Sequence, residues 1–374
     1  MYKKILILST HVPFIYGGNI NFINWLSLKI KEYYPEVLVD SILLPFNDNP
    51  NLVLKQIEGL KNLKFNYGDV LIASRPFSYV VEHSNKIVWF MHHLRYLYDL
   101  WDTKFNPLNK RDKKNIKLRK KIMEIDNKAL KSAKKVFAIS KNVANRLKKF
   151  NNIDAEVLYP PLFNEKQYYN ESYSDYIYFP SRITGNKRQH LAIQAMKYTK
   201  TNVKLIISGN IEGEYFKNHI KPLLKDNEIS SKVQIINNYI NEEEKLKLYA
   251  NALAVVFTPY DEDYGYITLE AFYSKKLLIT LSDSGGPTEF VENEYNGFIL
   301  ENDLKILAGT FDKLYSDKEL AKKMGENAYS YILSKNITWD NVFQKMFEES
   351  FEESNVSSNF LSKILSKILS KIRF

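Results

Sequence analysis

The sequence predicts an α/β protein with two doubly wound parallel-sheet domains, and three observations support this fold class. Short apolar runs typical of strands alternate with helical patterns from the first residues to about Glu349, as in successive βαβ units. The alternation stops at Pro160-Pro161 and starts again after a polar, tyrosine-rich segment. The length of 374 residues also suits two hydrophobic cores better than one.

In the first half, apolar runs rich in Val, Ile and Leu predict strands at residues 3–9, 37–44, 69–74, 86–91, 135–140 and 155–161. Apolar residues at helical spacing predict helices at residues 21–34, about 50–62 and 141–150, with a long basic helix before residue 135. Each helix therefore connects two strands, which favours a parallel sheet.

After the double proline, the same patterns predict strands at residues 176–181, 202–209, 232–236, 254–259 and 276–286. Helices are expected at residues 187–197, from about 214, at 242–252 and 266–274, and then onward to about Glu349. We divide the chain into residues 1–163, residues 164–336, a helix at 337–356 that crosses back to the first domain, and a tail helix at 357–374. A cleft between the carboxyl ends of the two sheets is the expected ligand site.

The composition narrows the class of protein. The chain has no Cys, which rules out disulfides and thiolate metal sites and fits a reducing cytoplasm. The opening MYKKILILST has too short an apolar run for a signal peptide and is interpreted as a buried strand. No run of about 18 apolar residues occurs, so no span of a bilayer is expected. We expect a cytoplasmic protein that is soluble or peripheral on the inner face of the cytoplasmic membrane.

Positive charge is concentrated in the segment from Lys104 to Lys135. This segment holds thirteen Lys or Arg against three acidic residues, an excess as large as the net charge of +10 of the whole chain. Such a patch attracts phosphate on anionic lipid, nucleic acid or a nucleotide. A plain solvated helix face would also explain it. No RNA-binding signature accompanies the basic residues, so nucleic acid is not an expected partner.

The tail repeats Leu-Ser-Lys-Ile three times. On a helix, one arc would carry the apolar residues Leu361, Ile364, Leu365, Ile368, Leu369 and Ile372. The lysines at 363, 367 and 371 would lie on another arc. This pattern is typical of helices that lie in a membrane interface. Docking on the protein itself or oligomerisation are the alternatives.

The stretch DEDYGYITLE at residues 261–270 joins a predicted strand to a predicted helix. The backbone N–H groups around Gly265, Tyr266 and Ile267 would lie at the helix N-terminus, where phosphates bind. Glu262 precedes the helix and Glu270 lies one turn into it, so the two carboxylates are expected to contact different parts of one ligand. The Asp-x-Asp spacing at 261–263 could hold a divalent metal, but two carboxylates alone make a weak site.

The segment DEDYGYITLEAF resembles the signature of family 4 of the retaining glycosyltransferases, in which seven residues separate two glutamates and include Phe/Tyr-Gly. Three other segments resemble the family in order and spacing, and they contain Gly17-Gly18, Arg182 with Lys187, and Gly285-Gly286 with Glu289. The resemblance covers residues 1 to about 350. It implies the GT-B fold, with an N-terminal Rossmann-like acceptor domain and a C-terminal Rossmann-like donor domain that face a central cleft.

The resemblance also implies roles for individual residues. Arg182 and Lys187 would hold the diphosphate of a nucleotide sugar, and a planar guanidinium beside a mobile ammonium suits two adjacent phosphates. Glu270 would bind the ribose hydroxyls, and Glu262 would contact the transferred sugar near the reacting carbon. The family requires no metal or other cofactor.

Three positions in the first domain complete the expected site. Gly17 and Gly18 lack a Cβ and would let the backbone approach the donor closely. The family often has an acidic residue soon after these glycines, where this chain has Asn19 and Asn21. A family histidine near the transferred sugar matches either His92 or His93. The loop after them carries Arg95, Tyr96 and Tyr98, which would contact an acceptor or pack in the core.

The expected activity is transfer of a sugar, with retention, from a nucleotide-diphosphate donor to a glycan or lipid-linked acceptor in surface polysaccharide or glycolipid synthesis. A nucleotide-sugar epimerase, a phosphorylase or another GT-B enzyme is the alternative among enzymes. The alternative from another class is a non-catalytic basic protein that binds lipid or nucleic acid. The donor base, the sugar, the acceptor and the oligomeric state have no residue signature in the sequence.

Overall fold

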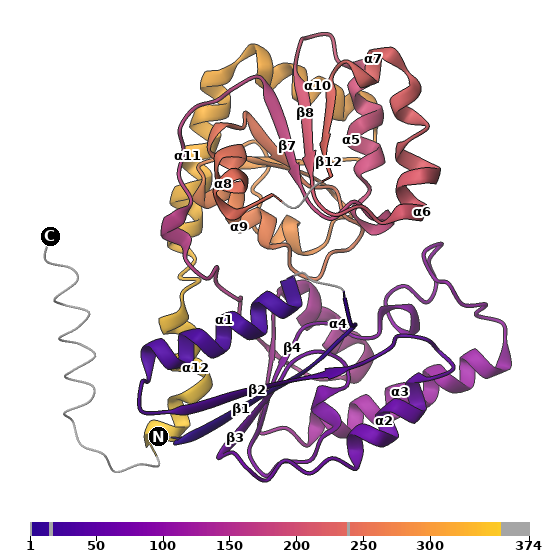
Figure 1. Cartoon of the computed structure of the whole chain (residues 1–374), viewed down its shortest axis with the longest axis vertical. Helices are drawn as coiled ribbons and strands as arrows, with labels where there is room; N and C mark the ends of the chain where they lie inside the picture. Colours follow the sequence, from indigo (N-terminus) through magenta and orange to yellow (C-terminus); the bar gives the residue numbers. More distant parts are fainter. Residues whose placement is uncertain (1, 15–17, 238–239, 353–374) are drawn as a thin grey trace, which may run out of the picture. The chain divides into compact units, whose positions relative to one another are not determined.

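The computed structural model describes residues 2–14, 18–237 and 240–352 (Figure 1). The chain forms two compact units, one from residues up to 136 together with those from 338, and the other from residues 137–337. The predicted tail helix and Gly17 lie outside the described residues. Among the described helices, none is long and apolar enough to cross a membrane.

The first sheet has the strand order β2-β1-β3-β4-β5-β6, and β1 pairs in parallel with both β2 and β3. Its strands are β1 (Lys4–His11), β2 (Leu38–Pro45), β3 (Val70–Ala73), β4 (Lys86–Phe90), β5 (Lys135–Ala138) and β6 (Glu156–Val157). The helices of this half are α1 (Gly18–Tyr33), α2 (Val53–Lys61), α3 (Lys113–Lys131) and α4 (Lys141–Asn151).

The central strands of this sheet are buried along most of their length. Every residue of β3 and β4 is buried, and so are Ile5 to Leu8 of β1. Helices cover both faces of such a sheet, which explains why its strands are continuous apolar runs in the sequence. The ring of Phe22 on α1 lies edge-on to Trp89 on β4, with centroids 4.7 Å apart.

The helix α12 (Trp339–Glu352) belongs to the first unit. It packs near the end of α1, where the Phe343 ring lies edge-on to Tyr33 and Tyr34 at 5.1 and 5.7 Å. The Tyr33 hydroxyl also donates a hydrogen bond of 3.0 Å to Asp340.

The second sheet has the order β12-β11-β10-β7-β8-β9, and each pairing in it is parallel. Its strands are β7 (Tyr176–Pro180), β8 (Lys204–Ser208), β9 (Val233–Ile236), β10 (Ala254–Val256), β11 (Leu278–Leu281) and β12 (Gly297–Leu300). The helices are α5 (Gln189–Ala195), α6 (Gly213–Tyr215), α7 (Asn227–Ser230), α8 (Glu242–Asn251), α9 (Tyr266–Tyr273), α10 (Leu304–Ser316) and α11 (Lys318–Ser334).

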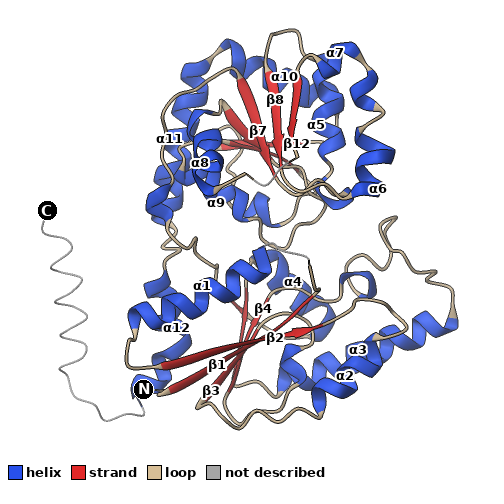
Figure 2. Ribbon diagram, in the orientation of Figure 1, coloured by secondary structure: helices blue, strands red, loops and turns tan. Residues whose placement is uncertain are grey.

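Helices lie on both faces of the second sheet, as Figure 2 shows. Helix α10 packs on α5, whereas α11 packs on α9. The strand order reverses direction between β7 and β10, which is the switch point where doubly wound sheets bind ligands. The α/β fold class with two doubly wound parallel sheets is confirmed.

The described structure differs from the sequence interpretation at two places in this half. The second compact unit begins at residue 137, whereas the sequence division is at 163 and 164, because residues 137–162 pack against the loops after β10 and β11. The helix expected from Lys187 begins instead at Gln189, because Arg188 adopts a left-handed backbone conformation with φ of 55°.

Candidate active site

The loop between β10 and α9 is fixed by a glycine. Gly265 precedes α9 with φ of 89°, a conformation that side chains disfavour. A Cβ at this position would lie 3.1 Å from Pro287 Cγ and 3.2 Å from Phe257 Cε1. The first N–H groups of α9, from Tyr266 and Ile267, have no acceptor within the helix, as at any helix start. The helix α9 therefore begins where the sequence predicts, with these N–H groups at its N-terminus.

Lys187 and Glu262 form an ion pair although 75 residues separate them in the sequence. The Lys187 ammonium lies 2.6 Å from Glu262 Oε2, and the two side chains are only 13% and 19% exposed. The ammonium also lies over the Phe257 ring, 5.2 Å from its centroid. The ion pair joins the loop after β7 to the loop after β10, at the switch point of the sheet.

Arg182 also follows β7, and its side chain is exposed. Among the residues that the structure describes, it makes no ion pair. Its backbone carbonyl accepts a hydrogen bond of 2.7 Å from Gln189 Nε2, which fixes the chain at this point. The guanidinium is thus available to a ligand while its backbone is held.

Arg188, the neighbour of Lys187, has a structural role that the sequence did not indicate. Its guanidinium donates to both carboxylate oxygens of Asp283, at 2.8 and 2.5 Å, and to the backbone carbonyls of Thr258 and Pro259. Arg188 is 5% exposed. The backbone turns at Arg188, so the side chains of Lys187 and Arg188 point in different directions. Only the Lys187 side chain reaches Glu262.

Glu270 is surrounded by donors. Its Oε1 accepts hydrogen bonds from the Tyr168 hydroxyl at 3.0 Å and Lys245 Nζ at 3.3 Å, and its Oε2 accepts one from Tyr249 at 2.6 Å. Burial and the Glu270 charge raise the pKa of the Tyr249 hydroxyl well above its ordinary value, so this hydroxyl stays a donor. Three of its roughly four lone-pair sites are thus occupied, and one on Oε2 is left for a further donor.

The two aspartates beside Glu262 are bound by an arginine from α4. Arg146, which is 5% exposed, pairs through Nη1 with Asp263 and through Nη2 with Asp261 at 2.7 Å. Asn142 adds a hydrogen bond of 2.8 Å to Asp261. Within the described residues, no group of three or more His, Cys, Asp or Glu could hold a metal ion. Asp261 and Asp263 thus fix this loop to α4, whereas the Glu262 carboxylate between them pairs with Lys187.

Glu289 caps the start of α4. Its carboxylate accepts hydrogen bonds from the backbone N–H groups of Lys141 and Asn142 at 2.9 and 2.7 Å, and from the Tyr159 hydroxyl at 2.9 Å. Burial raises the pKa of Glu289, although these donors oppose the shift. This interaction is the usual one of an acid with a helix N-terminus. Glu289 thus holds the segment that carries Arg146.

Gly285 and Gly286 bring the loop after β11 against Glu262. The N–H of Gly286 donates a hydrogen bond of 2.8 Å to the Glu262 carbonyl. A Cβ on Gly285, whose φ is 70°, would lie 2.6 Å from the same oxygen. Only residues without a Cβ fit this close approach, so these glycines fix the backbone that positions Glu262.

In the first unit, the two histidines lie in different environments. His93 is fully buried, stacked on Tyr98 with centroids 4.1 Å apart and edge-on to Phe90. His92 is partly exposed, and its Nδ1 lies 2.7 Å from the His93 carbonyl oxygen. Both follow the carboxyl end of β4. Gly18, the other described candidate of this unit, begins α1.

Sequence reasoning missed Arg146 and Arg188. Each is a buried cation with several acceptors, and such a cation has no local sequence signature because its partners are distant in the chain. Lys148 and Lys187, which lie close to these arginines in the sequence, carry the same charge but pair with other carboxylates, those of Asp154 and Glu262.

Comparison with known proteins finds a family model that matches part of the chain. Residues 163–331 match the family model described as glycosyl transferases group 1. The alpha-1,3/1,6-mannosyltransferase ALG2 of Dictyostelium discoideum is 34% identical over 96 residues, which are 26% of this chain. The aligned part covers only 23% of that relative's length.

Two solved structures share the fold over nearly the whole chain. Sucrose-phosphate synthase from Thermosynechococcus elongatus superposes with a TM-score of 0.75 at 16% identity and covers 94% of this chain and 100% of its own. Anabaena Alr3699/HepE in complex with UDP-glucose has a TM-score of 0.67 at 17% identity, with coverage of 93% and 99%. The chain therefore has the two-domain α/β fold of GT-B glycosyltransferases, and its residues 163–331 match glycosyl transferases group 1.

Proposed function

We propose that this protein is a metal-independent, retaining glycosyltransferase of family 4. It transfers a sugar from a nucleotide-diphosphate donor to a glycan or lipid-linked acceptor, in the synthesis of surface polysaccharide or glycolipid. The observation that carries the proposal is the Lys187–Glu262 pair of 2.6 Å beside the N-terminus of α9, inside the region that matches glycosyl transferases group 1.

The donor diphosphate binds where positive potential is concentrated. Lys187, the exposed guanidinium of Arg182 and the first amides of α9 surround this place. As the bond between the anomeric carbon and the leaving phosphate breaks, negative charge grows on the diphosphate. Donors that are already in position stabilise that charge without reorganising. The acceptor hydroxyl bonds to the same face of the sugar, and its proton passes to the departing phosphate.

The two glutamates bind the two ends of the donor. Glu270, held by Tyr168, Tyr249 and Lys245, accepts a hydrogen bond from the ribose hydroxyls through the lone pair left on Oε2. When the donor is bound, its diphosphate and Glu262 both contact the Lys187 ammonium, and the Glu262 carboxylate contacts the transferred sugar. A fixed carboxylate orients a ligand with little loss of side-chain entropy.

The first unit contributes the residues that bind the acceptor. His92 is the better candidate of the two histidines because it is partly exposed, whereas His93 is enclosed by Phe90 and Tyr98. We place the enzyme on the inner face of the cytoplasmic membrane, where a lipid-linked acceptor would be presented.

Two of the similar proteins support the donor class. HepE was solved with UDP-glucose, a nucleotide-diphosphate sugar, and ALG2 is named as a mannosyltransferase. Neither name assigns a base or a sugar to this chain.

A transfer assay tests the proposal. Thermal-shift screening against UDP, GDP, ADP and dTDP sugars first selects the donor, because a ligand of the folded state raises its melting temperature. Lys187→Ala and Glu270→Ala are expected to abolish most transfer and to leave the fold intact, while Lys217→Ala, an exposed lysine of the same unit, serves as the control.

Two outcomes would contradict the proposal. Loss of transfer in EDTA, restored by Mg²⁺ or Mn²⁺, would show that a metal is required. Conversion of the donor without any acceptor would instead indicate an epimerase.

A further inference from the structure

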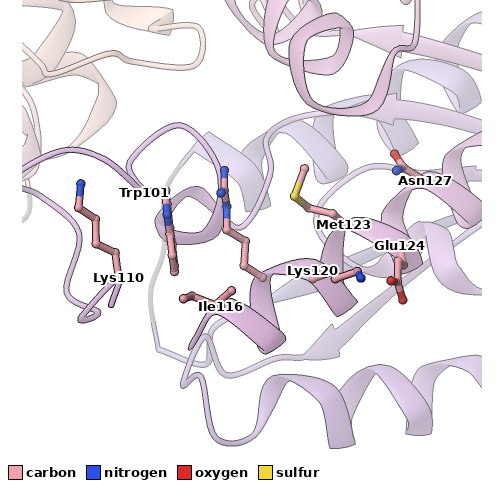
Figure 3. A pocket seen from close by; sticks show the side chains of 8 residues that line it. Trp101, Lys110, Ile116, Lys120, Met123, Glu124 and Asn127 are labelled. Atoms are coloured by element: carbon pink, nitrogen blue, oxygen red, sulfur yellow. The ribbon is translucent and has the colours of Figure 1, made fainter. Parts of the chain in front are cut away.

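A cavity of about 480 Å³ lies beside α3, outside the donor site (Figure 3). Six of its lining residues come from one stripe of the helix, and two from the loop before it. They are Ile116, Arg119, Lys120, Met123, Glu124 and Asn127 on α3, with Trp101 and Lys110 from the loop. The six residues on α3 recur at intervals of three or four, so their side chains lie on one face of the helix.

The wall of the cavity is apolar and aromatic. Trp101 is 7% exposed and presents its ring to the cavity. Ile116 is 50% exposed, so about half of its side chain is accessible to a ligand. Together with Met123, these side chains form a surface that would bury hydrocarbon.

The rim of the cavity is cationic, and its arginine is already in position. Arg119 Cζ lies 4.9 Å from the centroid of the Trp101 ring, and its Nε donates a hydrogen bond of 2.8 Å to the Leu97 carbonyl. These contacts leave the terminal nitrogens of the guanidinium for a ligand. Within the described part of the chain, Arg119 and Lys120 make no ion pair. A guanidinium fixed in this way suits the bidentate geometry of a phosphate.

The surrounding charge favours an anion. Around the cavity, α3 exposes Lys113, Lys114, Lys117 and Lys121, and its other acidic residue, Asp126, is fully buried. Of the acidic groups near the rim, Glu124 lies 3.8 Å from Lys121, and Asp102 lies 2.9 Å from Lys110. The net potential at the cavity is thus positive, and an anionic ligand gains from it.

We propose that this cavity binds the phosphate headgroup of an anionic lipid and so docks the first unit on a membrane. The phosphate contacts Arg119, and Lys110 and Lys120, which lie at opposite ends of the lining (Figure 3), add positive potential on either side. The glycerol and upper acyl carbons contact Trp101, Ile116 and Met123. An apolar wall beneath a cationic rim matches an amphipathic anion better than it matches RNA, because no stacked series of exposed aromatic rings accompanies the basic residues. This docking requires neither the donor site nor the transfer reaction.

Sedimentation of the full-length protein with lipid vesicles tests this site. Vesicles of phosphatidylcholine with about one third phosphatidylglycerol are compared with pure phosphatidylcholine. The triple variant Lys110→Gln, Arg119→Gln, Lys120→Gln is expected to bind the anionic vesicles about 100-fold more weakly, at roughly fivefold per removed charge. Pure phosphatidylcholine vesicles are expected to bind neither protein strongly.

A matched triple variant separates a specific site from a diffuse basic surface. Lys117→Gln, Lys128→Gln, Lys131→Gln removes the same charge from exposed positions on α3 that do not line the cavity. Because these lysines do not touch the bound headgroup and act on it only through a potential that salt screens, this variant is expected to lose no more than about fivefold in total. Equal losses in the two triple variants would overturn the proposal, and so would unchanged binding of the first variant, which would place the lipid contact elsewhere in the chain.

A second pair of substitutions tests the apolar wall without changing the charge. Ile116→Ser with Met123→Ser is expected to weaken vesicle binding roughly tenfold, through lost burial of hydrocarbon. Circular dichroism and thermal melting confirm that each variant folds. Unchanged vesicle binding of this double variant would reject the lipid contact. Tighter binding of the parent protein to a single-stranded RNA oligonucleotide than to anionic vesicles would also refute the proposal.

Discussion

The ion pair between Lys187 and Glu262 makes a counterintuitive prediction for substrate binding. A nucleoside diphosphate must share the Lys187 ammonium with Glu262, whose carboxylate carries the same sign of charge as the phosphates. Glu262→Gln keeps the shape of the side chain and removes the charge. We therefore expect Glu262→Gln to bind the nucleoside diphosphate more tightly than the parent protein, although transfer is lost.

The magnitude follows from the geometry of the pair. At 2.6 Å and with exposures of 13% and 19%, the interaction is a charge-assisted hydrogen bond that solvent screens only in part. Replacing it by a neutral hydrogen bond weakens the competition for Lys187 by about 1–1.5 kcal/mol. That difference corresponds to a dissociation constant lower by about 5- to 12-fold.

Isothermal titration calorimetry measures this effect with the nucleoside diphosphate chosen by thermal-shift screening. Lys187→Ala is expected to weaken binding by roughly tenfold or more, in the opposite direction. Glu301→Gln, a charge removal at an exposed position after β12, serves as the control and leaves the dissociation constant unchanged. Equal or weaker binding by Glu262→Gln would show that the carboxylate does not compete with the phosphates, and the reasoning would be refuted.

Three further predictions concern stability. Arg146→Met leaves Asp261 and Asp263 without their buried partner and is expected to lower the free energy of unfolding by about 3 kcal/mol in urea; the exposed neighbour variant Lys148→Met should change it little. Gly265→Ala forces a side chain onto a φ of 89° and is expected to cost about 1–3 kcal/mol, with a lower melting temperature as the readout. Burial raises the pKa of Asp126 to about 7 despite two tyrosine hydroxyl donors. Because that folded-state pKa exceeds the unfolded value of about 3.9, stability from the protonated form is present below pH 4 and is lost as the pH rises through 7. Urea titrations between pH 4 and pH 8 should show that decrease in the parent protein and a smaller one in Asp126→Asn.

The sequence by itself determined the alternation of strands and helices. Apolar runs such as KIVWF in β4 are short and β-branched because helices cover both faces of the sheet, and this pattern is local enough to be seen in a single chain. The loops that carry Glu262, Gly265 and Lys187 could be predicted for the same reason, since each directly follows a strand or precedes a helix. The start of α9 at Tyr266 agreed with the structure.

The tertiary structure decided which charged residues pair with one another. Lys187 and Arg188 are adjacent cations, yet one reaches Glu262 and the other is buried on Asp283, because the backbone at Arg188 is left-handed. The prominent acids Asp261 and Asp263 both pair with one arginine more than 100 residues earlier in the chain. Such interactions depend on distances between segments that are remote in the chain. Local patterns specify the elements, whereas the partners of a buried charge are specified only when those elements pack.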